Sequence, residues 1–466
     1  MPAPPTADLR ANDVSPDHPR LDRGENHQAN AAIVDAQNKN TESATSPDVA
    51  SGALGPFLLP LYRVFWGASL FSNLGTWVHE IGAGWLMTEL NGNPQVVASV
   101  RTAMALPIMF LAIPAGVIAD RFDRRWLLLG TQIMLLGVAL TLALCTYYQM
   151  VSVWGLLIAT AAMGIGMTLH VPTWQATIPQ LVSRPMLPQA VALGSLSFNL
   201  ARCVGPAVGG FCIWLVGIWS AFALNSISFT GVILAVLWWN YREPRATDVQ
   251  TRSRHSSRDA ASFWDDMIQG VRFALTDTIM RRTLCRLMMF IFPAAGFWAL
   301  APWIARYHLN WSAEGYGMLI GTLGGGAVAM AFFLPTLRRI LGVNQMLLLL
   351  GWLFAGAFVV IGFSQQSWVV LPMTFLMGGA WMGVLTTLNA SSQLRLPGEM
   401  RARGMACHLT VMAIAMSVGS FAWGQCAQWT SGLQTQWIAA AMMVVLSTLG
   451  ARFAPLGRDD PTAAML

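Results

Sequence analysis

Charged side chains inside long apolar runs are the residues of this sequence that could do chemistry. Among the Asp and Glu residues, Glu80 is the one acid well inside such a run, and Glu89 lies near the end of the same run. A carboxylate in an apolar span is costly, so it is either paired or functional. Because an acid in this position can bind and release a proton, we predict that Glu80 is a proton-coupling residue.

Arg101 is the natural partner of this acid. Glu80 precedes the turn between two apolar runs by about nine residues and Arg101 follows that turn by about eight, so helical rise places them at similar depths. We predict that the two side chains form an ion pair. The alternative is that Arg101 binds a substrate while Glu80 exchanges its proton independently.

Four residues around this acid share one helical face. Asn73, Trp77, Glu80 and Gly84 follow one another at spacings of four, three and four, which places them on the same side of a helix. We expect this face to line a cavity that accepts a substrate. His79 lies on a different face, and we expect it to be a packing or interface residue.

Arg202 is a second arginine within an apolar run, in the sequence SFNLARCVG. An arginine near the middle of a span must face a cavity or a partner. Arg101 and Arg202 together outweigh Glu80, so the predicted cavity is net positive. It favours an anionic or carboxylate-bearing substrate, which guanidinium groups bind in two-point fashion. The alternative is that Arg202 bonds to backbone carbonyls and is purely structural.

The composition indicates the elements that must position these residues. The chain has 466 residues, of which 55% are hydrophobic and 11% charged, whereas soluble domains carry about 25% charged residues. It is therefore expected to be a polytopic membrane protein. The net charge is +6, and the basic residues are nearly all arginines in loops, so they indicate membrane orientation rather than a nucleic-acid-binding face. The six cysteines form no CxxC pair, so neither a disulfide framework nor a zinc site is indicated.

Apolar runs of roughly 20 residues alternate with short polar turns from residue 59 onward, and this is the length that a helix needs to cross a bilayer. We predict an all-α membrane protein with twelve transmembrane helices in two sets of six. The predicted helices lie near 61–87, 95–119, 126–147, 152–171, 190–214, 217–239, 283–305, 312–336, 344–364, 368–390, 403–425 and 434–454.

The helices divide the chain into five segments. Residues 1–55 are polar and without apolar periodicity, which predicts a disordered cytoplasmic tail. Six-helix bundles are expected at 56–240 and 283–456. Residues 241–282 are expected to join them as a cytoplasmic linker that contains an amphipathic helix on the membrane surface, and 457–466 form a C-terminal tail.

The distribution of arginine predicts the orientation. Arginine occurs in alternate loops, while the loops between them carry no Lys or Arg, with one exception. By the positive-inside rule, the arginine-bearing loops and both termini are cytoplasmic, in a cell inner (plasma) membrane. The exception is the turn after the seventh helix, which carries Arg306 and His308.

The turn between the second and third helices, GVIADRFDRR, is densely charged. Its residues of interest are Gly116, Asp120, Arg121, Asp123, Arg124 and Arg125. The pattern resembles the loop between the second and third helices of major facilitator transporters, with Asp123 where that family usually has glycine. In the family this loop closes the cytoplasmic side against the start of the eleventh helix, where an aspartate is favoured. The resemblance therefore implies a gate between Asp120 with its neighbours and Arg401 with Arg403. Purely topological charge is the alternative.

Three longer stretches resemble one exporter branch, the transmembrane secretion effectors, which includes enterobactin exporters. They are Pro172–Gly210, Glu314–Arg339 and Ser391–Leu409, and the resemblance extends over about 57–455. It implies the major facilitator fold, in which two six-helix bundles surround a central cavity and exchange access between the two sides.

The sequence VGPAVGG within the first stretch resembles the fifth-helix antiporter motif of exporters. It contains Gly205, Pro206 and Gly209. Two glycines four residues apart let helix backbones approach closely, so plain helix packing is an alternative that does not exclude the motif.

The resemblance implies a secondary transporter that works as a single chain. We expect it to export a small molecule, a siderophore or similar amphipathic metabolite, by proton antiport. Macrolide-type multidrug efflux is the alternative, and a membrane scaffold that recruits partners through its N-terminal tail is a different class of function. Its partners would be the small molecule, protons and the lipid bilayer.

Enzymatic activity is not expected. The single lysine, Lys39, follows no glycine-rich turn, so the chain has no phosphate-binding P-loop for ATP hydrolysis. The sequence also contains no HExxH or GxSxG motif. We therefore predict no catalytic residues, no cofactor and no metal.

Overall fold

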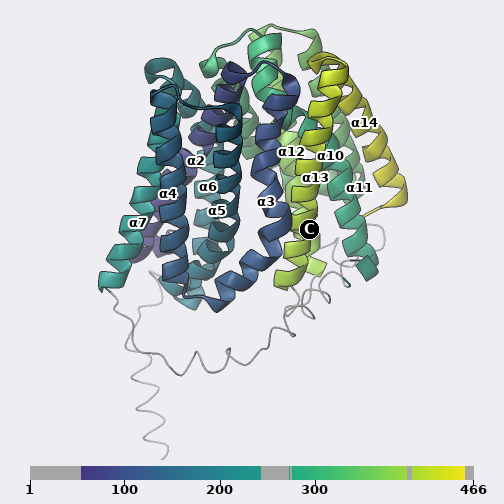
Figure 1. The fold of residues 1–466 in the computed structure, drawn as a ribbon. Coiled ribbons are helices and arrows are strands. Elements are labelled where there is room, and N and C mark those ends of the chain that lie inside the picture. Colours follow the sequence, from purple (N-terminus) through teal and green to yellow (C-terminus); the bar gives the residue numbers. More distant parts are fainter. Residues whose placement is uncertain (1–53, 243–271, 273–274, 396–400, 457–466) are drawn as a thin grey trace, which may run out of the picture. The chain divides into compact units, whose positions relative to one another are not determined.

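The computed structural model describes residues 54–242, 272, 275–395 and 401–456. Regular structure in this part of the chain is helical throughout (Figure 1). The helices of the first half are η1 (Gly55–Leu58), α2 (Pro60–Leu90), α3 (Pro94–Arg121), α4 (Arg124–Tyr147), α5 (Val153–Leu181), η2 (Arg184–Met186), α6 (Leu187–Val216) and α7 (Trp219–Arg242). Those of the second half are α10 (Thr278–Trp303), η3 (Ile304–His308), α11 (Ala313–Phe363), α12 (Ser367–Arg395), α13 (Arg401–Trp429) and α14 (Gly432–Phe453).

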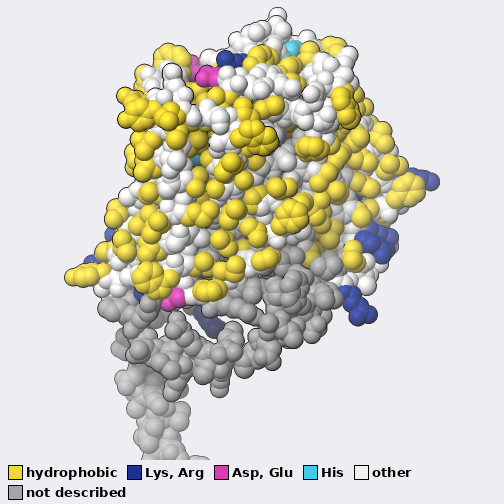
Figure 2. Space-filling model, in the orientation of Figure 1, with side chains coloured by type: hydrophobic (Ala, Val, Ile, Leu, Met, Phe, Trp, Pro, Cys, Tyr) yellow, Lys and Arg dark blue, Asp and Glu magenta, His cyan; other side chains and the backbone are white. Residues whose placement is uncertain are grey.

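Ten helices in the described part of the chain are long and apolar enough to cross a membrane. Side chains such as Trp154, Phe332 and Trp368 are at least 74% exposed, and Figure 2 shows hydrophobic side chains across the middle of the visible face. A soluble protein would not expose so much apolar surface. The protein is therefore a multi-pass membrane protein, as the composition predicts.

Helix α11 is 51 residues long and contains one break. Gly342, with φ of 69° and ψ of 160°, is non-helical inside it. Glycine adopts positive φ without steric cost, so it lets the chain turn between two helical segments. These segments match the predicted eighth and ninth spans at 312–336 and 344–364. Helix α2 is not among the ten helices with a membrane-spanning composition.

The helices pack as two groups. Helices α2 to α7 contact one another, as do α10 to α14, and the two groups meet mainly where α3 packs on α13 and α6 packs on α11. Figure 1 shows α3 and α13 side by side. We call these groups the first and the second bundle.

Glycines set the closest approach between the bundles. A Cβ atom on Gly210 of α6 would lie 2.6 Å from the Ala313 carbonyl oxygen of α11, and one on Gly324 of α11 would lie 2.7 Å from the Arg202 carbonyl oxygen. In a helix the residue at position 206 would normally donate its backbone N–H to the Arg202 carbonyl, but Pro206 has no N–H. The Arg202 carbonyl lies against Gly324 instead. Small residues at these positions allow α6 and α11 to meet backbone to backbone.

Helix α5 ends ten residues later than predicted. The expected span stopped at residue 171, before Pro172, but the helix continues through Pro172 and Pro179 to Leu181. In a membrane span a freed backbone carbonyl is costly, so neighbouring groups re-satisfy it and the helix persists through proline.

Helix α10 also begins earlier than predicted, at Thr278 rather than near residue 283. Asp277 caps it by accepting a hydrogen bond from the Met280 backbone N–H at 2.8 Å, as N-terminal aspartates commonly do. The predicted tails and nearly all of the predicted linker helix lie outside the described residues.

The close contact between α6 and α11 gives a testable expectation. Gly210→Ala should lower stability by about 1–3 kcal/mol, because the new methyl group meets backbone atoms that cannot rotate away. Thermal unfolding in detergent measures this change. The matched control is Gly194→Ala on the same helix, where nothing lies within 4 Å of the added atom. Equal melting temperatures for the two variants would contradict the interpretation.

Candidate functional site

A cleft of about 540 Å³ lies where the two bundles meet. Helices α2, α3 and α5 of the first bundle and α10 and α11 of the second line it. Its polar and aromatic lining includes His79, Glu80, Arg101, Trp298 and Tyr316. A concave site with a few convergent polar groups is typical of a small-molecule site.

The ion pair predicted from the sequence is confirmed. The Nη1 atom of Arg101 lies 3.2 Å from Oε2 of Glu80, and both side chains are 22% exposed. The Arg101 guanidinium also lies over the ring of Trp298, 5.2 Å from its centroid. Since Trp298 belongs to α10, this cation–π contact joins the pair of the first bundle to the second bundle.

Aromatic side chains form the wall of the cleft beyond the pair. Trp298 and Tyr316 line the cleft, and the ring of Trp85 stacks on that of Tyr316 with centroids 6.2 Å apart. A Cβ atom on Gly84 would lie 3.1 Å from the Tyr316 hydroxyl, so a larger residue at this position would push into the wall. Sequence reasoning missed Trp298 and Tyr316, because only the docking of the bundles places them beside α2.

His79 combines the packing role that the sequence predicts with a place at the cleft. It is 4% exposed, and its ring meets Phe222 edge to face at 4.9 Å. It also lines the cleft, together with Thr76 and Ala83 of the same helix. Within the described residues its ring nitrogens have no hydrogen-bond partner. The spacing of Thr76, His79 and Ala83 is the signal that could have indicated this position.

Asn73 and Trp77 lie against α6. The amide nitrogen of Asn73 is 3.4 Å from the Ser197 hydroxyl oxygen, and a Cβ atom on Gly205 would lie 2.6 Å from that of Trp77. Gly209 makes a similar approach, because its Cβ atom would lie 3.0 Å from a backbone atom of α2. The close packing expected of the two motif glycines is therefore present. A contact of Asn73 or Trp77 with a substrate stays a prediction.

Arg202 is buried between the bundles, with 8% of its surface exposed. Its Nη2 atom donates to the Asn199 side-chain oxygen at 3.0 Å and lies 3.5 Å from the sulfur of Met382 on α12. No ion pair is found for Arg202 within the described residues. It is therefore an arginine that faces the second bundle without a carboxylate partner, and its role toward a substrate stays a prediction.

The charged turn between α3 and α4 is held to the first bundle. Asp123 caps α4 by accepting from the Arg125 backbone N–H at 2.9 Å. Arg124 donates to the Ala176 carbonyl of α5 at 3.0 Å, and the Arg125 guanidinium lies 3.9 Å from the ring centroid of Trp239. Gly116 lies within α3. The side chains of Asp120, Arg121, Arg401 and Arg403 lie outside the described ones, so the predicted gate stays a prediction.

The bundles also meet at the end of the helices where α2 turns into α3. We call it the Asn91 end, after the first residue of that turn. Here the Gln95 side chain donates to that of Gln425 on α13 at 2.6 Å. The indole N–H of Trp303 donates to the Gly92 carbonyl at 3.2 Å. The two bundles are therefore closed against each other at this end.

The fold and the cleft define a membrane transporter. The chain matches the transmembrane secretion effector family over residues 51–462, and it belongs to that family of major facilitator transporters. Relatives include the staphyloferrin A transporter of Staphylococcus aureus (strain NCTC 8325 / PS 47), 22% identical over 67% of this chain and 77% of the relative. Macrolide efflux protein A of Enterococcus faecalis is 23% identical over 70% of this chain and 98% of its own length.

Solved structures share the fold. A bacterial homologue of the human lysosomal transporter Spinster superposes with a TM-score of 0.62 at 14% identity, covering 85% of this chain and 97% of that one. A POT family transporter in complex with 5-aminolevulinic acid gives a TM-score of 0.65 at 12% identity, covering 84% of this chain and 96% of that one. The family and its relatives are transporters rather than enzymes.

The Glu80–Arg101 pair gives a second testable expectation. Glu80→Arg and Arg101→Glu should each lower stability and transport, since either places two like charges together in a partly buried cleft, at a cost of about 1–3 kcal/mol. The double variant Glu80→Arg/Arg101→Glu should recover part of both losses, measured by thermal unfolding and by transport in vesicles. No recovery in the double variant would show that the two side chains act independently.

Proposed function

We propose that this transporter exports a small molecule, a siderophore or similar amphipathic metabolite, in exchange for protons. The observation that carries the proposal is the Glu80–Arg101 pair in the cleft between the bundles. An ionised Glu80 pairs with Arg101, and a proton on Glu80 removes that pair. Protonation of one carboxylate thereby changes the contacts at the junction of the two bundles, which is where alternating access requires a change.

The place of Glu80 in the lining of the cleft supports exchange rather than co-transport. A cargo bound in the cleft would cover Glu80 and keep protons from reaching it. Cargo and proton would occupy the carrier in alternation, which is the requirement for antiport.

The orientation and the helix number complete the proposal. Helix α2 and the two segments of α11 would bring the total to twelve spans. Arginines such as Arg124, Arg282 and Arg338 lie at or beyond the helix ends opposite the Asn91 end. By the positive-inside rule those ends and both termini face the cytoplasm of a cell inner membrane. The Asn91 end is then the outer side, and the bundles close there.

Arg202 supports a carboxylate-bearing cargo. It is a buried guanidinium whose nearest polar partners are an amide oxygen and a thioether. A carboxylate would offer it the stronger, charge-assisted partner that it lacks among the described residues. The relative from Staphylococcus aureus, the staphyloferrin A transporter, is consistent with a siderophore cargo.

Macrolide-type drug efflux is the second candidate. The aromatic lining formed by Trp298 and Tyr316 favours it, because flat apolar surfaces bind bulky amphipathic molecules with little charge selectivity. The relative named macrolide efflux protein A is consistent with this candidate. In both candidates the same cleft and the same acid would be used.

Everted membrane vesicles test the proposal. When the inside of the vesicles is more acidic than the outside, vesicles that contain the protein should accumulate a carboxylate siderophore. A protonophore should abolish this accumulation. Arg202→Gln should weaken siderophore binding by about tenfold or more, since a charge-assisted bond is lost, while Arg202→Lys should retain part of it. Accumulation of a macrolide but no siderophore would favour drug efflux, and accumulation that ignores the protonophore would contradict proton exchange.

A further inference from the structure

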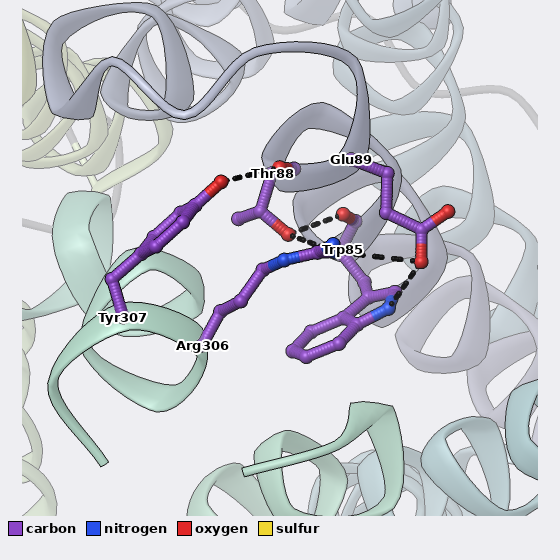
Figure 3. Close-up of polar contacts among 5 residues, drawn as sticks. All are labelled: Trp85, Thr88, Glu89, Arg306 and Tyr307. Atoms are coloured by element: carbon purple, nitrogen blue, oxygen red, sulfur yellow. Dashed lines mark hydrogen bonds and ion pairs between the residues drawn. The ribbon is translucent and has the colours of Figure 1, made fainter. Parts of the chain in front are cut away.

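Several arginines of the second bundle have partners within the protein. The Nη1 atom of Arg306 lies 3.4 Å from Oε1 of Glu89 and 3.3 Å from the Thr88 hydroxyl oxygen (Figure 3). At the opposite end of the helices, Nη1 of Arg282 donates to the Pro455 carbonyl at 3.3 Å. These contacts account for the places of both guanidinium groups.

Arg452, in the last turn of α14, differs from these arginines. Its side chain is exposed, and it has no ion pair or hydrogen bond within the described residues. The acids in the described part of the second bundle are Asp277, which caps α10, and Glu314, in the first turn of α11 at the Asn91 end. The guanidinium of Arg452 is therefore available to an anion from outside the chain.

The helix face that carries Arg452 is apolar along the rest of its length. Val445, Leu449 and Arg452 follow one another at spacings of four and three, which places them on one side of α14. Both apolar side chains are exposed. In a membrane protein an exposed apolar face is covered by lipid, so this face of α14 is a lipid-facing surface with a cation at its end.

The second segment of α11 presents a face of the same kind. Gln345, Leu349 and Trp352 also follow one another at spacings of four and three, and all three side chains are exposed. Gln345 lies three residues after the break at Gly342. This face therefore begins with an amide group and continues with apolar and aromatic side chains.

Two hydrogen bonds place these faces side by side. The indole N–H of Trp352 donates to the Thr448 hydroxyl at 3.2 Å, and the side-chain amide of Asn344 donates to the Ala451 carbonyl at 3.1 Å. The second bond brings the start of the α11 face to the end of α14 that carries Arg452. We call this surface the α11–α14 seam, formed by Gln345, Leu349, Trp352, Val445, Leu449 and Arg452.

The polar end of the seam is held in place from inside the bundle. The Asn344 side-chain oxygen accepts from Nη2 of Arg286 at 2.9 Å, while its nitrogen donates to the Ala451 carbonyl. Both polar atoms of this amide are used, and they tie α10, α11 and α14 together. The seam is therefore formed before any ligand binds, which lowers the entropic cost of binding.

We propose that the α11–α14 seam binds one anionic phospholipid of the surrounding membrane. Arg452 binds the phosphate, because a guanidinium group offers it two parallel charge-assisted hydrogen bonds. The Gln345 amide donates to an oxygen of the headgroup, and the acyl chains lie along Leu349 and Val445. Basic pockets between membrane helices bind anionic headgroups in this way. The site lies outside the transport cleft and goes beyond the proposed function.

The apolar part of the seam favours a lipid over a free phosphate ion. A free phosphate would use Arg452 and leave the exposed apolar side chains without a partner, whereas a phospholipid covers both parts at once. Figure 2 shows Lys and Arg side chains next to hydrophobic ones on the side of the molecule where Figure 1 labels α11 and α14. This combination matches the headgroup and acyl chains of a phospholipid.

Lipid titrations followed by native mass spectrometry test the site. The full chain in detergent would be titrated with phosphatidylglycerol and, separately, with phosphatidylcholine of the same acyl chains. The protein should hold one phosphatidylglycerol about fivefold more tightly than phosphatidylcholine, since one basic residue near an anionic headgroup contributes about this factor. Equal affinities for the two lipids would overturn the proposal.

Variants decide whether Arg452 is the group responsible. Arg452→Gln should remove the preference for phosphatidylglycerol, and Arg452→Lys should keep part of it. Both positions are exposed on the surface, so Arg184→Gln, which removes an exposed arginine of η2 in the first bundle, is the matched control. The control should keep the parent's preference. An Arg452→Gln variant with the parent's preference, or an equal loss in the control, would overturn the assignment.

Inorganic phosphate separates a lipid site from a simple anion site. Phosphate in large excess should not displace the bound phosphatidylglycerol, because it cannot replace the contacts of the acyl chains. Displacement would overturn the lipid assignment. These measurements use neither cargo nor a proton gradient, so the seam could fail while the proposed function holds, or hold while that function fails.

Discussion

The cost of a charge inside the membrane is the constraint on which the rest of this structure depends. An unpaired charge in an apolar span is so unfavourable that each one must find a partner or a cavity. The Glu80–Arg101 pair meets this requirement at the junction of the bundles. Arg286 of α10 meets it differently, because it donates to the Ser447 carbonyl at 3.3 Å and to the Asn344 side-chain oxygen at 2.9 Å and so ties α10 to α11 and α14. One proton on Glu80 would remove the Glu80–Arg101 pair. The contacts of Arg286 include no acid, so they are structural.

The same constraint limits what holds the two bundles together. Lipid solvates apolar side chains about as well as another helix does, so the bundles are held by close packing and a few polar contacts. Glycines bring α6 and α11 together, and hydrogen bonds with one ion pair among the described residues connect the bundles at the Asn91 end. Closure that depends on a small number of contacts can be reversed by the binding of a proton or a ligand.

Much of this arrangement could be predicted from the sequence, and the limits have physical causes. Hydrophobic run length predicted the helices, and helical rise on either side of one turn predicted the Glu80–Arg101 pair, because both depend on local geometry. Trp298 and Tyr316 carried no local signal, since only the docking of two bundles brings them to the cleft. Arg306 was visible as an exception to the charge rule, but its partner was not, for the same reason. The span predicted at 152–171 ended too early, because helix α5 continues through Pro172 and Pro179 to Leu181, as membrane helices can.

The most direct test of the account is proton flux in proteoliposomes, with purified wild-type protein and Glu80→Gln compared under an outward cargo gradient. The account predicts that cargo movement drives proton movement in the opposite direction in the wild type, and that Glu80→Gln abolishes the proton movement while the protein still binds cargo. Equal proton flux in both proteins would contradict the account, because the carboxylate in the cleft would then have no part in coupling.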